Sequence, residues 1–166
     1  MVIKILSFGM SSPLFKEVMK VRKTVFVDEL GMDPEFDFDG LDDKAVHFLL
    51  TVNDKPVGSA RWVETDQGIK IERLATIPEY RGQGLGQLLL RQVVFDVLPS
   101  KKRIYLHSPE LLVEFFRWNG FEVDGEKFEE AGVPHYKMVY TKQQHKGSEI
   151  SNFFKGLFKR TKNYYL

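Results

Sequence analysis

A glycine-rich turn, Arg81-Gly82-Gln83-Gly84-Leu85-Gly86, constrains the fold of this chain most, because it joins a strand-like segment to a helix-like one. Residues 69–76 have the composition of a strand, which Pro78 ends. From Leu85 the apolar residues recur at the helical period and stop before Pro99. Glycines at such a junction let the backbone approach a ligand closely and leave several N–H groups pointing outward. The sequence therefore predicts a strand–turn–helix unit that can hold an anion.

The spacing of the glycines distinguishes between the known phosphate-binding turns. A helix N-terminus carries a partial positive charge, so the turn favours phosphate, and Arg81 adds a full charge. A Walker turn requires G-x-x-x-x-G-K-[ST], and the chain has no such run. A dinucleotide turn requires G-x-G-x-x-G, but Gln87 stands where the third glycine is needed. The pattern that fits is R-x-x-G-x-G, formed by Arg81, Gly84 and Gly86.

The remaining segments predict one mixed α/β domain. Strand patterns fall at residues 2–8, 45–52, 56–64, 69–76, 104–106, 121–123 and 136–141, and helix patterns begin at Ser12, Leu85 and Pro109. The acidic stretch after the first helix reads as a loop or short helix, and a polar loop separates the last two strands. Three hairpin-type strands before a strand–helix–strand unit favour a mixed sheet with helices on both faces.

Composition excludes several classes of protein. The chain has no cysteine, so it holds neither a disulfide framework nor a cysteine-ligated zinc ion, as is usual in a reducing compartment. Residues 1–7 alternate apolar and polar side chains too briefly for a signal peptide. No apolar run approaches the roughly 18 residues of a membrane span. We therefore expect a cytoplasmic protein.

The R-x-x-G-x-G turn, placed between a strand and an amphipathic helix, resembles the pyrophosphate-binding motif of the GNAT superfamily of N-acetyltransferases. Residues 71–78 resemble the central strand of that superfamily, and the order of elements matches over about residues 2–141. Residues 25–31 and 128–135 are similar to the ElaA-like and YjcF-like subgroup. The resemblance implies a GNAT-like, mostly antiparallel sheet, splayed at its fourth and fifth strands. It also implies an N-acetyltransferase domain over residues 1–141, followed by a basic aromatic tail over residues 142–166.

The same resemblance implies an activity and a co-substrate. The chain would be an acyltransferase that moves an acetyl group from acetyl-CoA to a primary amine, without a metal. We expect direct attack by the amine, since there is no cysteine and no Ser-His-acid set stands out. By resemblance, a bulge splays the central strand from its neighbour, and backbone groups of Leu74, Ala75 and Thr76 would bind the acyl and pantetheine part. The pyrophosphate would lie on Arg81, Gly82, Gln83, Gly84, Leu85, Gly86 and Gln87.

A neutral attacking amine requires a base or a proton path. Glu72 is a catalytic candidate because it precedes Leu74 by two residues, so a regular strand would turn both side chains to one face. The alternative is that Glu72 pairs with Arg61 across the sheet. His107 is the second catalytic candidate, and His47 and His135 compete with it, although a histidine in a strand is more often a hydrogen-bonded core residue.

One position departs from the family pattern. Many relatives carry a tyrosine acid in the segment that corresponds to residues 115–121, where this chain has Phe116. Phenylalanine has no proton to donate to the departing thiolate. Either solvent protonates the thiolate, or His107, which stands where many relatives have asparagine, protonates it, or catalysis is impaired. The alternative function is therefore a non-catalytic acyl-CoA-binding or protein-interaction domain of the same fold.

Two charged blocks bear on partners. Residues 28–43 carry eight carboxylates and no Lys or Arg. Such blocks are usually solvated, although carboxylates beside a cleft would also attract a small-molecule or peptide amine. The tail 142–166 carries six basic residues against one glutamate. A basic amphipathic tail can lie on a membrane, but we rank that below packing against the domain or a second subunit. We expect no nucleic-acid partner, and either a monomer or a homodimer.

Overall fold

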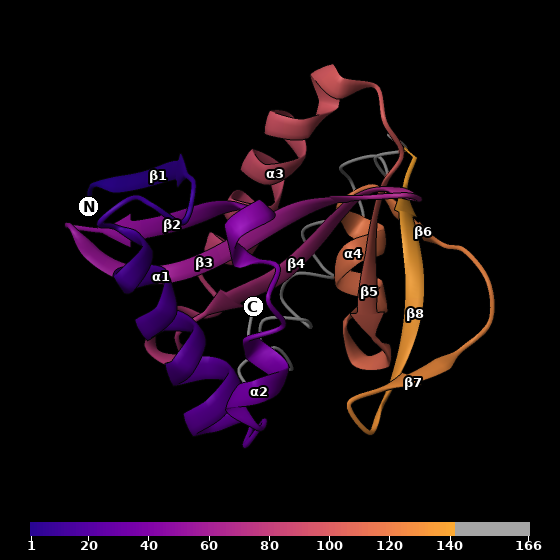
Figure 1. The fold of residues 1–166 in the computed structure, drawn as a ribbon, viewed down its shortest axis with the longest axis horizontal. Helices are drawn as coiled ribbons and strands as arrows, with labels where there is room; N and C mark the ends of the chain where they lie inside the picture. Colours follow the sequence, from indigo (N-terminus) through magenta and orange to yellow (C-terminus); the bar gives the residue numbers. More distant parts are fainter. Residues whose placement is uncertain (142–166) are drawn as a thin grey trace.

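Eight strands form one sheet in the computed structural model, which describes residues 1–141 (Figure 1). The strands are β1 (Ile3–Phe8), β2 (Val46–Val52), β3 (Lys55–Thr65), β4 (Gly68–Thr76), β5 (Ile104–Pro109), β6 (Phe121–Val123), β7 (Phe128–Glu130) and β8 (Val133–Tyr140). Their order is β1-β2-β3-β4-β5-β8-β6, and β7 pairs with β8. Only β4 and β5 pair in parallel; the other described pairs are antiparallel. The tail predicted at 142–166 lies outside the described residues.

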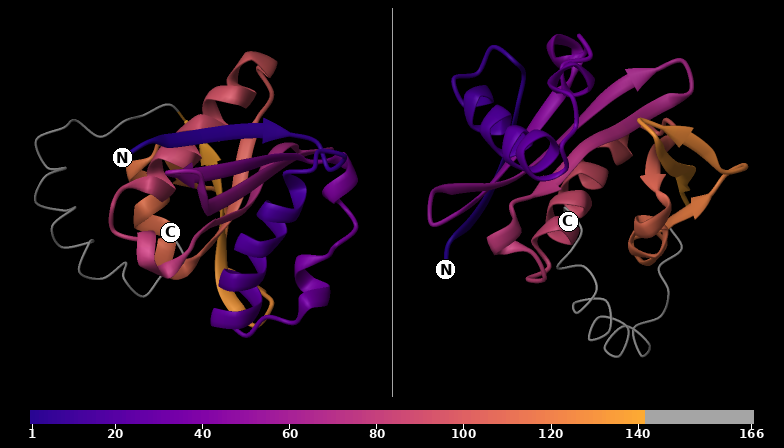
Figure 2. Two further views of the ribbon diagram at one scale, coloured as in Figure 1. Left: turned by 90° about the vertical axis from the view of Figure 1, so that its left-hand side faces the viewer. Right: turned by 90° about the horizontal axis from the view of Figure 1, so that it is seen from below.

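The helices are α1 (Phe15–Arg22), α2 (Pro34–Asp37), α3 (Leu85–Val97) and α4 (Val113–Trp118), with a π-helical turn η1 (Lys23–Glu29) and 3₁₀ turns η2 (Asp42–Lys44), η3 (Pro78–Tyr80), η4 (Leu98–Ser100) and η5 (Glu110–Leu112). Helices α1 and α3 lie on opposite faces of the sheet (Figure 2). Val21 and Val25 contribute to the core from the first side, and Leu89 and Val93 from the second. No helix among residues 1–141 is long and apolar enough to cross a membrane.

The sheet opens between β4 and β5. Their pairing is limited to Ile69 with Ile104 and Lys70 with Tyr105. Beyond Lys70 the two strands diverge (Figure 1). The predicted fold class, a mixed and mostly antiparallel sheet splayed at its fourth and fifth strands with helices on both faces, is confirmed.

The segment before the last strand differs from the prediction. A polar loop was expected up to residue 136, but β7 and β8 form a hairpin in which Glu130 faces Val133. Ala131 and Gly132 make the two-residue turn, with φ of 51° and 74°. Two successive left-handed residues match the twist of a tight hairpin. The acidic Phe128-Glu129-Glu130 run hides this strand, since too few apolar residues alternate to indicate it.

Candidate functional site

The glycine-rich turn presents backbone rather than side chains. Gly82 and Gly84 have φ of 72° and 78°, and Gly84 is the N-cap residue of α3. No side chain in residues 1–141 caps this helix start. The first N–H groups of any α-helix lack intrahelical partners, and those of α3 have no capping side chain in the described part of the chain either. A Cβ atom added at Gly84 would meet no protein atom within 4 Å, so space is open beside these donors. The turn has the features of an anion site built from N–H groups and the helix dipole.

The side chain of Arg81 does not add the positive charge that the sequence predicts beside the phosphates. It is buried, and its Nε donates to the carbonyl oxygen of Thr76 at 2.8 Å. Its guanidinium is paired with the carboxylate of Glu29, with Nη1 to Oε1 at 2.6 Å. Glu29 is the last residue of η1. Arg81 thus ties the turn to the end of β4 and to η1, and the charge is compensated inside the protein.

A β-bulge at Arg73 interrupts β4 just before the residues expected to hold the acyl group. Ser59 and Arg61 are two residues apart on β3, but their partners on β4, Ala75 and Glu72, are three apart. Arg73 is the residue in the left-handed region, with φ of 54°. A bulge of this kind adds one residue and re-aims the side chains that follow.

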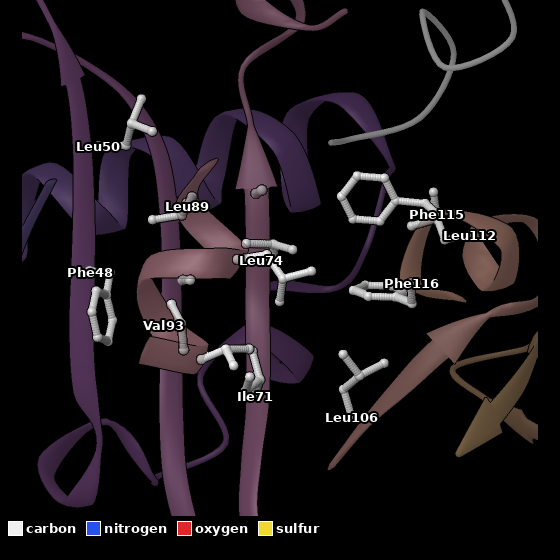
Figure 3. Packing of buried hydrophobic residues seen from close by; sticks show 14 of the residues in the cluster. Phe48, Leu50, Ile71, Leu74, Leu89, Val93, Leu106, Leu112, Phe115 and Phe116 are labelled. Carbon is white, nitrogen blue, oxygen red and sulfur yellow. The ribbon is translucent and has the colours of Figure 1, made fainter. Parts of the chain in front are cut away.

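The bulge corrects the expectation that Glu72 and Leu74 share a face. Paired residues in an antiparallel ladder point to the same side, so the register places Glu72 with Ala75 instead. Leu74 lies in the apolar core, near Leu89 of α3 (Figure 3). Because β5 has already diverged, Ala75 and Thr76 have a strand partner only on the β3 side within the described chain, and Leu74, in the bulge, has none. All three residues are buried, but their backbone edge toward β5 is not paired with a described strand.

Glu72 is held in a double ion pair. Its Oε2 accepts from Nη2 of Arg61 at 2.7 Å and its Oε1 lies 2.8 Å from Nζ of Lys70. Burial alone would raise the pKa of Glu72, but Lys70 and then Arg61 outweigh it and hold the pKa below its usual value. A carboxylate with a lowered pKa is a weak proton acceptor at neutral pH. The geometry favours the alternative in which Glu72 pairs with Arg61 across the sheet.

The acidic segment is solvated only in part, because Asp37 and Asp42 are buried while the other carboxylates of residues 28–43 are exposed. We call the following set the arginine cluster: Arg22, Arg61 and Arg73 with Asp37, Asp39, Asp42 and Glu72. Nη1 of Arg61 contacts Asp42 at 2.8 Å, and Nε of Arg22 contacts Asp37 at 3.0 Å. Burial would raise the pKa values of Asp39 and Asp42, but the arginines lower them overall. These carboxylates are internal counterions, which reduces the attraction for an amine that they could exert.

The histidines occupy different environments. His47 is fully buried on β2, and its Nε2 donates to the carbonyl of Asp42 at 2.9 Å. Burial is the main cause that lowers the pKa of His47. His107 on β5 is partly exposed and its Nδ1 lies 3.1 Å from Oε1 of Glu130. His135 on β8 approaches the other oxygen of Glu130 at 3.6 Å. Of the three, only His107 lies on a strand that borders the opening.

Phe116, at the position where a tyrosine was expected by resemblance, is a core residue. It is buried, and its ring centroid lies 5.2 Å from that of Phe115 and 6.0 Å from that of Phe121. It points from α4 toward β4 and Leu74 (Figure 3). This side chain packs and offers no proton.

Sequence reasoning missed two residues here. Lys70 holds one oxygen of Glu72, and Glu130 links two histidines. An alternation argument could have found Lys70, since it lies two residues before Glu72 on one strand. Glu130 lies in the hairpin that was expected to be a loop, and the resemblance of residues 128–135 to the subgroup gave it no role.

Comparison with known proteins agrees with this geometry. The model of the acetyltransferase (GNAT) domain matches residues 31–142. The uncharacterized N-acetyltransferase YjcF of Bacillus subtilis is 29% identical over 126 residues, which cover 75% of this chain and 90% of YjcF. The crystal structure of Escherichia coli ElaA superimposes with a TM-score of 0.75 and 28% identity, over 84% of this chain and 100% of that chain.

A GNAT family acetyltransferase from Elizabethkingia anophelis, solved with acetyl-CoA bound, shares the fold with a TM-score of 0.59 and 17% identity, over 82% of this chain and 94% of that chain. The family model spans well over half of the 166 residues, and the opened sheet, the bulged β4 and the R-x-x-G-x-G turn lie inside its match. The chain belongs to the GNAT acetyltransferase family.

Proposed function

We propose that residues 1–141 form a cytoplasmic N-acyltransferase domain that moves an acetyl group from acetyl-CoA to a primary amine by direct attack. The observation that carries the proposal is the continuity of two backbone features. The unpaired edge of β4 at Leu74, Ala75 and Thr76 leads, within a few residues, to the open start of α3 at Gly84. One ligand with an extended amide arm and a pyrophosphate could contact both.

The residues present fit such a ligand. Peptide-like groups of the arm would pair with the free edge of β4, as an added strand does. The pyrophosphate would accept from N–H groups of residues 82–87 at the helix start, where the dipole favours negative charge. Arg81 would act by holding the turn in place through Thr76 and Glu29.

When bound, acetyl-CoA supplies a thioester carbonyl that a neutral amine can attack. A backbone N–H near the bulge would stabilise the oxyanion that develops on the carbonyl oxygen. Solvent would protonate the departing thiolate, since Phe116 cannot. The acceptor is a small-molecule or peptide amine.

A substitution at Gly84 tests the cofactor site. Gly84→Asn should retain the fold, because asparagine tolerates a left-handed conformation and its side chain enters open space. That side chain would occupy the phosphate position, so we expect the Kd for acetyl-CoA, measured by calorimetry, to rise at least about tenfold, or ~1.4 kcal/mol. Gly132→Asn is the matched control, with φ of 74° and equally open space. Equal affinity in both variants and the wild type would remove the turn from the proposal.

The second candidate is a non-catalytic acyl-CoA-binding domain, and buried Phe116 favours it. The two functions differ in amine-dependent release of CoA. The screen should offer spermidine, amino acids, an aminoglycoside and a short peptide with a free N-terminus. Release with any of them supports transfer, whereas acetyl-CoA binding without release on any acceptor supports the second function.

A further inference from the structure

Three titratable side chains from three strands meet beside the opening of the sheet. Glu130 of β7 lies between His107 of β5 and His135 of β8, with Oε1 3.1 Å from Nδ1 of His107 and Oε2 3.6 Å from Nε2 of His135. We call these three residues the histidine cluster. Among residues 1–141, no group of three or more metal-ligating side chains is arranged to hold a metal ion.

The hydrogen bonds fix the tautomers. A carboxylate only accepts hydrogen bonds, so Nδ1 of His107 carries the proton and donates a hydrogen bond to Glu130. In this tautomer, Nε2 of His107 has a lone pair. A carbonyl also only accepts, so Nδ1 of His135 donates to Val133 at 2.8 Å. His107 is thereby presented as a base, in the same way as a carboxylate orients a catalytic histidine.

The ring of Phe128 holds both imidazoles. Its centroid lies 4.9 Å from that of His107 in an edge-on contact and 6.0 Å from that of His135 in a stacked one. Phe128 and Glu130 alternate on β7, so both reach the same side of the hairpin. Aromatic packing of this kind restricts ring rotation, which gives His107 a defined orientation.

The cluster lies on the face of the sheet that Glu72 occupies. Lys70 pairs with Tyr105 at the last position where β4 and β5 join, and His107 follows Tyr105 by two residues. Ile104 and Leu106 face the core, so Tyr105 and His107 point to the opposite side. His107 is the first titratable side chain of β5 past the divergence. The charged and titratable groups around it are Lys70 and Glu72 of β4, Tyr105 of β5, Glu130 of β7, and His135 and Lys137 of β8.

We propose that Nε2 of His107 accepts the proton that the acceptor amine must lose, and that Glu130 is the positioning residue for that step. The inference rests on the proposed acyl transfer. The ammonium of the acceptor gives one proton to Nε2, and the neutral nitrogen attacks the thioester carbonyl. The C–N bond forms and the C–S bond breaks. A second proton passes from the nitrogen to water, and the thiolate takes one proton from water. His107, whose side chain is 24% exposed, returns its proton to solvent.

The contrast with Glu72 supports this assignment. Both oxygens of Glu72 are engaged by cations, and its pKa is lowered. An imidazole titrates near neutral pH, which suits a base for an amine. The bond to His107 is the main cause that lowers the pKa of Glu130, which therefore stays ionised and can keep the tautomer of His107.

The test compares His107→Gln, Glu130→Gln and the wild type, with acetyl-CoA and the acceptor from the screen that releases CoA fastest. In His107→Gln we expect the Kd for acetyl-CoA to stay within about twofold and kcat/KM for the amine to fall about 10²–10⁴-fold. Glu114→Gln, in an exposed pair with Arg117, is the matched control and should match the wild type.

Glu130→Gln separates positioning from structure. Activity should rise with pH, because only an unprotonated base accepts a proton. Glu130→Gln removes a negative charge that favours a protonated neighbour, so the acidic limb of the pH profile should move to lower pH. If Glu130 had only a structural role, Glu130→Gln would change the maximal activity and leave the acidic limb of the pH profile at the same pH.

The outcomes distinguish this inference from the proposed function. Wild-type turnover that survives in His107→Gln, or an acidic limb that Glu130→Gln does not move, overturns the role of the histidine cluster and leaves acyl transfer standing. A wild type that binds acetyl-CoA and transfers to no amine overturns both.

Discussion

The arginine cluster and the histidine cluster lie on one face of one sheet, yet they differ in whether their side chains can exchange protons near neutral pH. In the arginine cluster, the fully buried Arg22 and Arg61 neutralise Asp37, Asp39, Asp42 and Glu72. The pKa of a guanidinium lies far above neutral pH, and the carboxylates raise that of Arg61 further against the effect of burial. No proton leaves this cluster near neutral pH.

The histidine cluster is only half covered. The side chains of His107 and Glu130 are 24% and 45% exposed, and imidazole changes its charge between pH 5 and 8. A carboxylate can thus serve in two ways on the same sheet. Paired with arginine it joins α1, β3 and β4 to the acidic segment, and paired with histidine it orients an imidazole.

Breaking the arginine cluster should have the largest effect. Arg61→Met would leave Asp39, Asp42 and Glu72 without a shared cation inside the protein. Removing one partner of a buried ion pair costs about 3–5 kcal/mol, so we expect that loss in the free energy of unfolding, measured by urea denaturation.

Arg117→Met is the control for this change. Arg117 makes an exposed pair with Glu114, where 41% and 53% of the side chains are accessible. Such pairs contribute about 0–1 kcal/mol. A loss in Arg61→Met no greater than in Arg117→Met would mean that the arginine cluster contributes little to stability.

Acid should weaken the fold in two steps. The lowered pKa of His47 means that the unfolded chain binds more protons once the pH falls below about 6.5, so stability declines from there. The lowered pKa values of Asp39, Asp42 and Glu72 add a second loss below about pH 4. Each proton taken up preferentially by the unfolded chain costs about 1.4 kcal/mol per pH unit.

Urea midpoints measured from pH 8 to pH 3 would check both steps. His47→Gln should flatten the first step and keep the second. A midpoint that stays constant between pH 6.5 and pH 5 in the wild type would contradict the buried, neutral state of His47.

Local patterns in the sequence predicted most of the strands and the glycine-rich turn, because alternation, helical periodicity and glycine placement act over a few residues. The opening and a bulge were implied by the family resemblance. Local patterns did not place the bulge at Arg73, since nothing about an arginine favours a φ of 54°. The surrounding contacts impose it, as Arg73 is bonded to Asp37 and Asp39. The bulge in turn moved Leu74 away from the face of Glu72.

The arginine cluster and the histidine cluster could not be predicted from the sequence for a related reason. Arg22, Asp42 and Arg61 are about twenty residues apart along the chain and meet only because α1 crosses β3. The acidic segment therefore resembled a solvated loop. Glu130 went unnoticed because its strand has three residues and begins a hairpin whose turn, Ala131-Gly132, is a weak signal.

The smallest expected effect on stability sharpens the comparison most. Glu130→Gln should cost about 0–1 kcal/mol in the free energy of unfolding, because the carboxylate is 45% exposed and its partners are histidines. Glu72→Gln should cost about 1.5–3 kcal/mol, because two partly buried hydrogen bonds from Arg61 lose their charge on the acceptor. Urea denaturation of both variants at pH 7.5 gives the difference. If Glu130→Gln were as costly as Glu72→Gln, the histidine cluster would be a structural element like the arginine cluster, and its exposure to solvent would have no bearing on proton transfer.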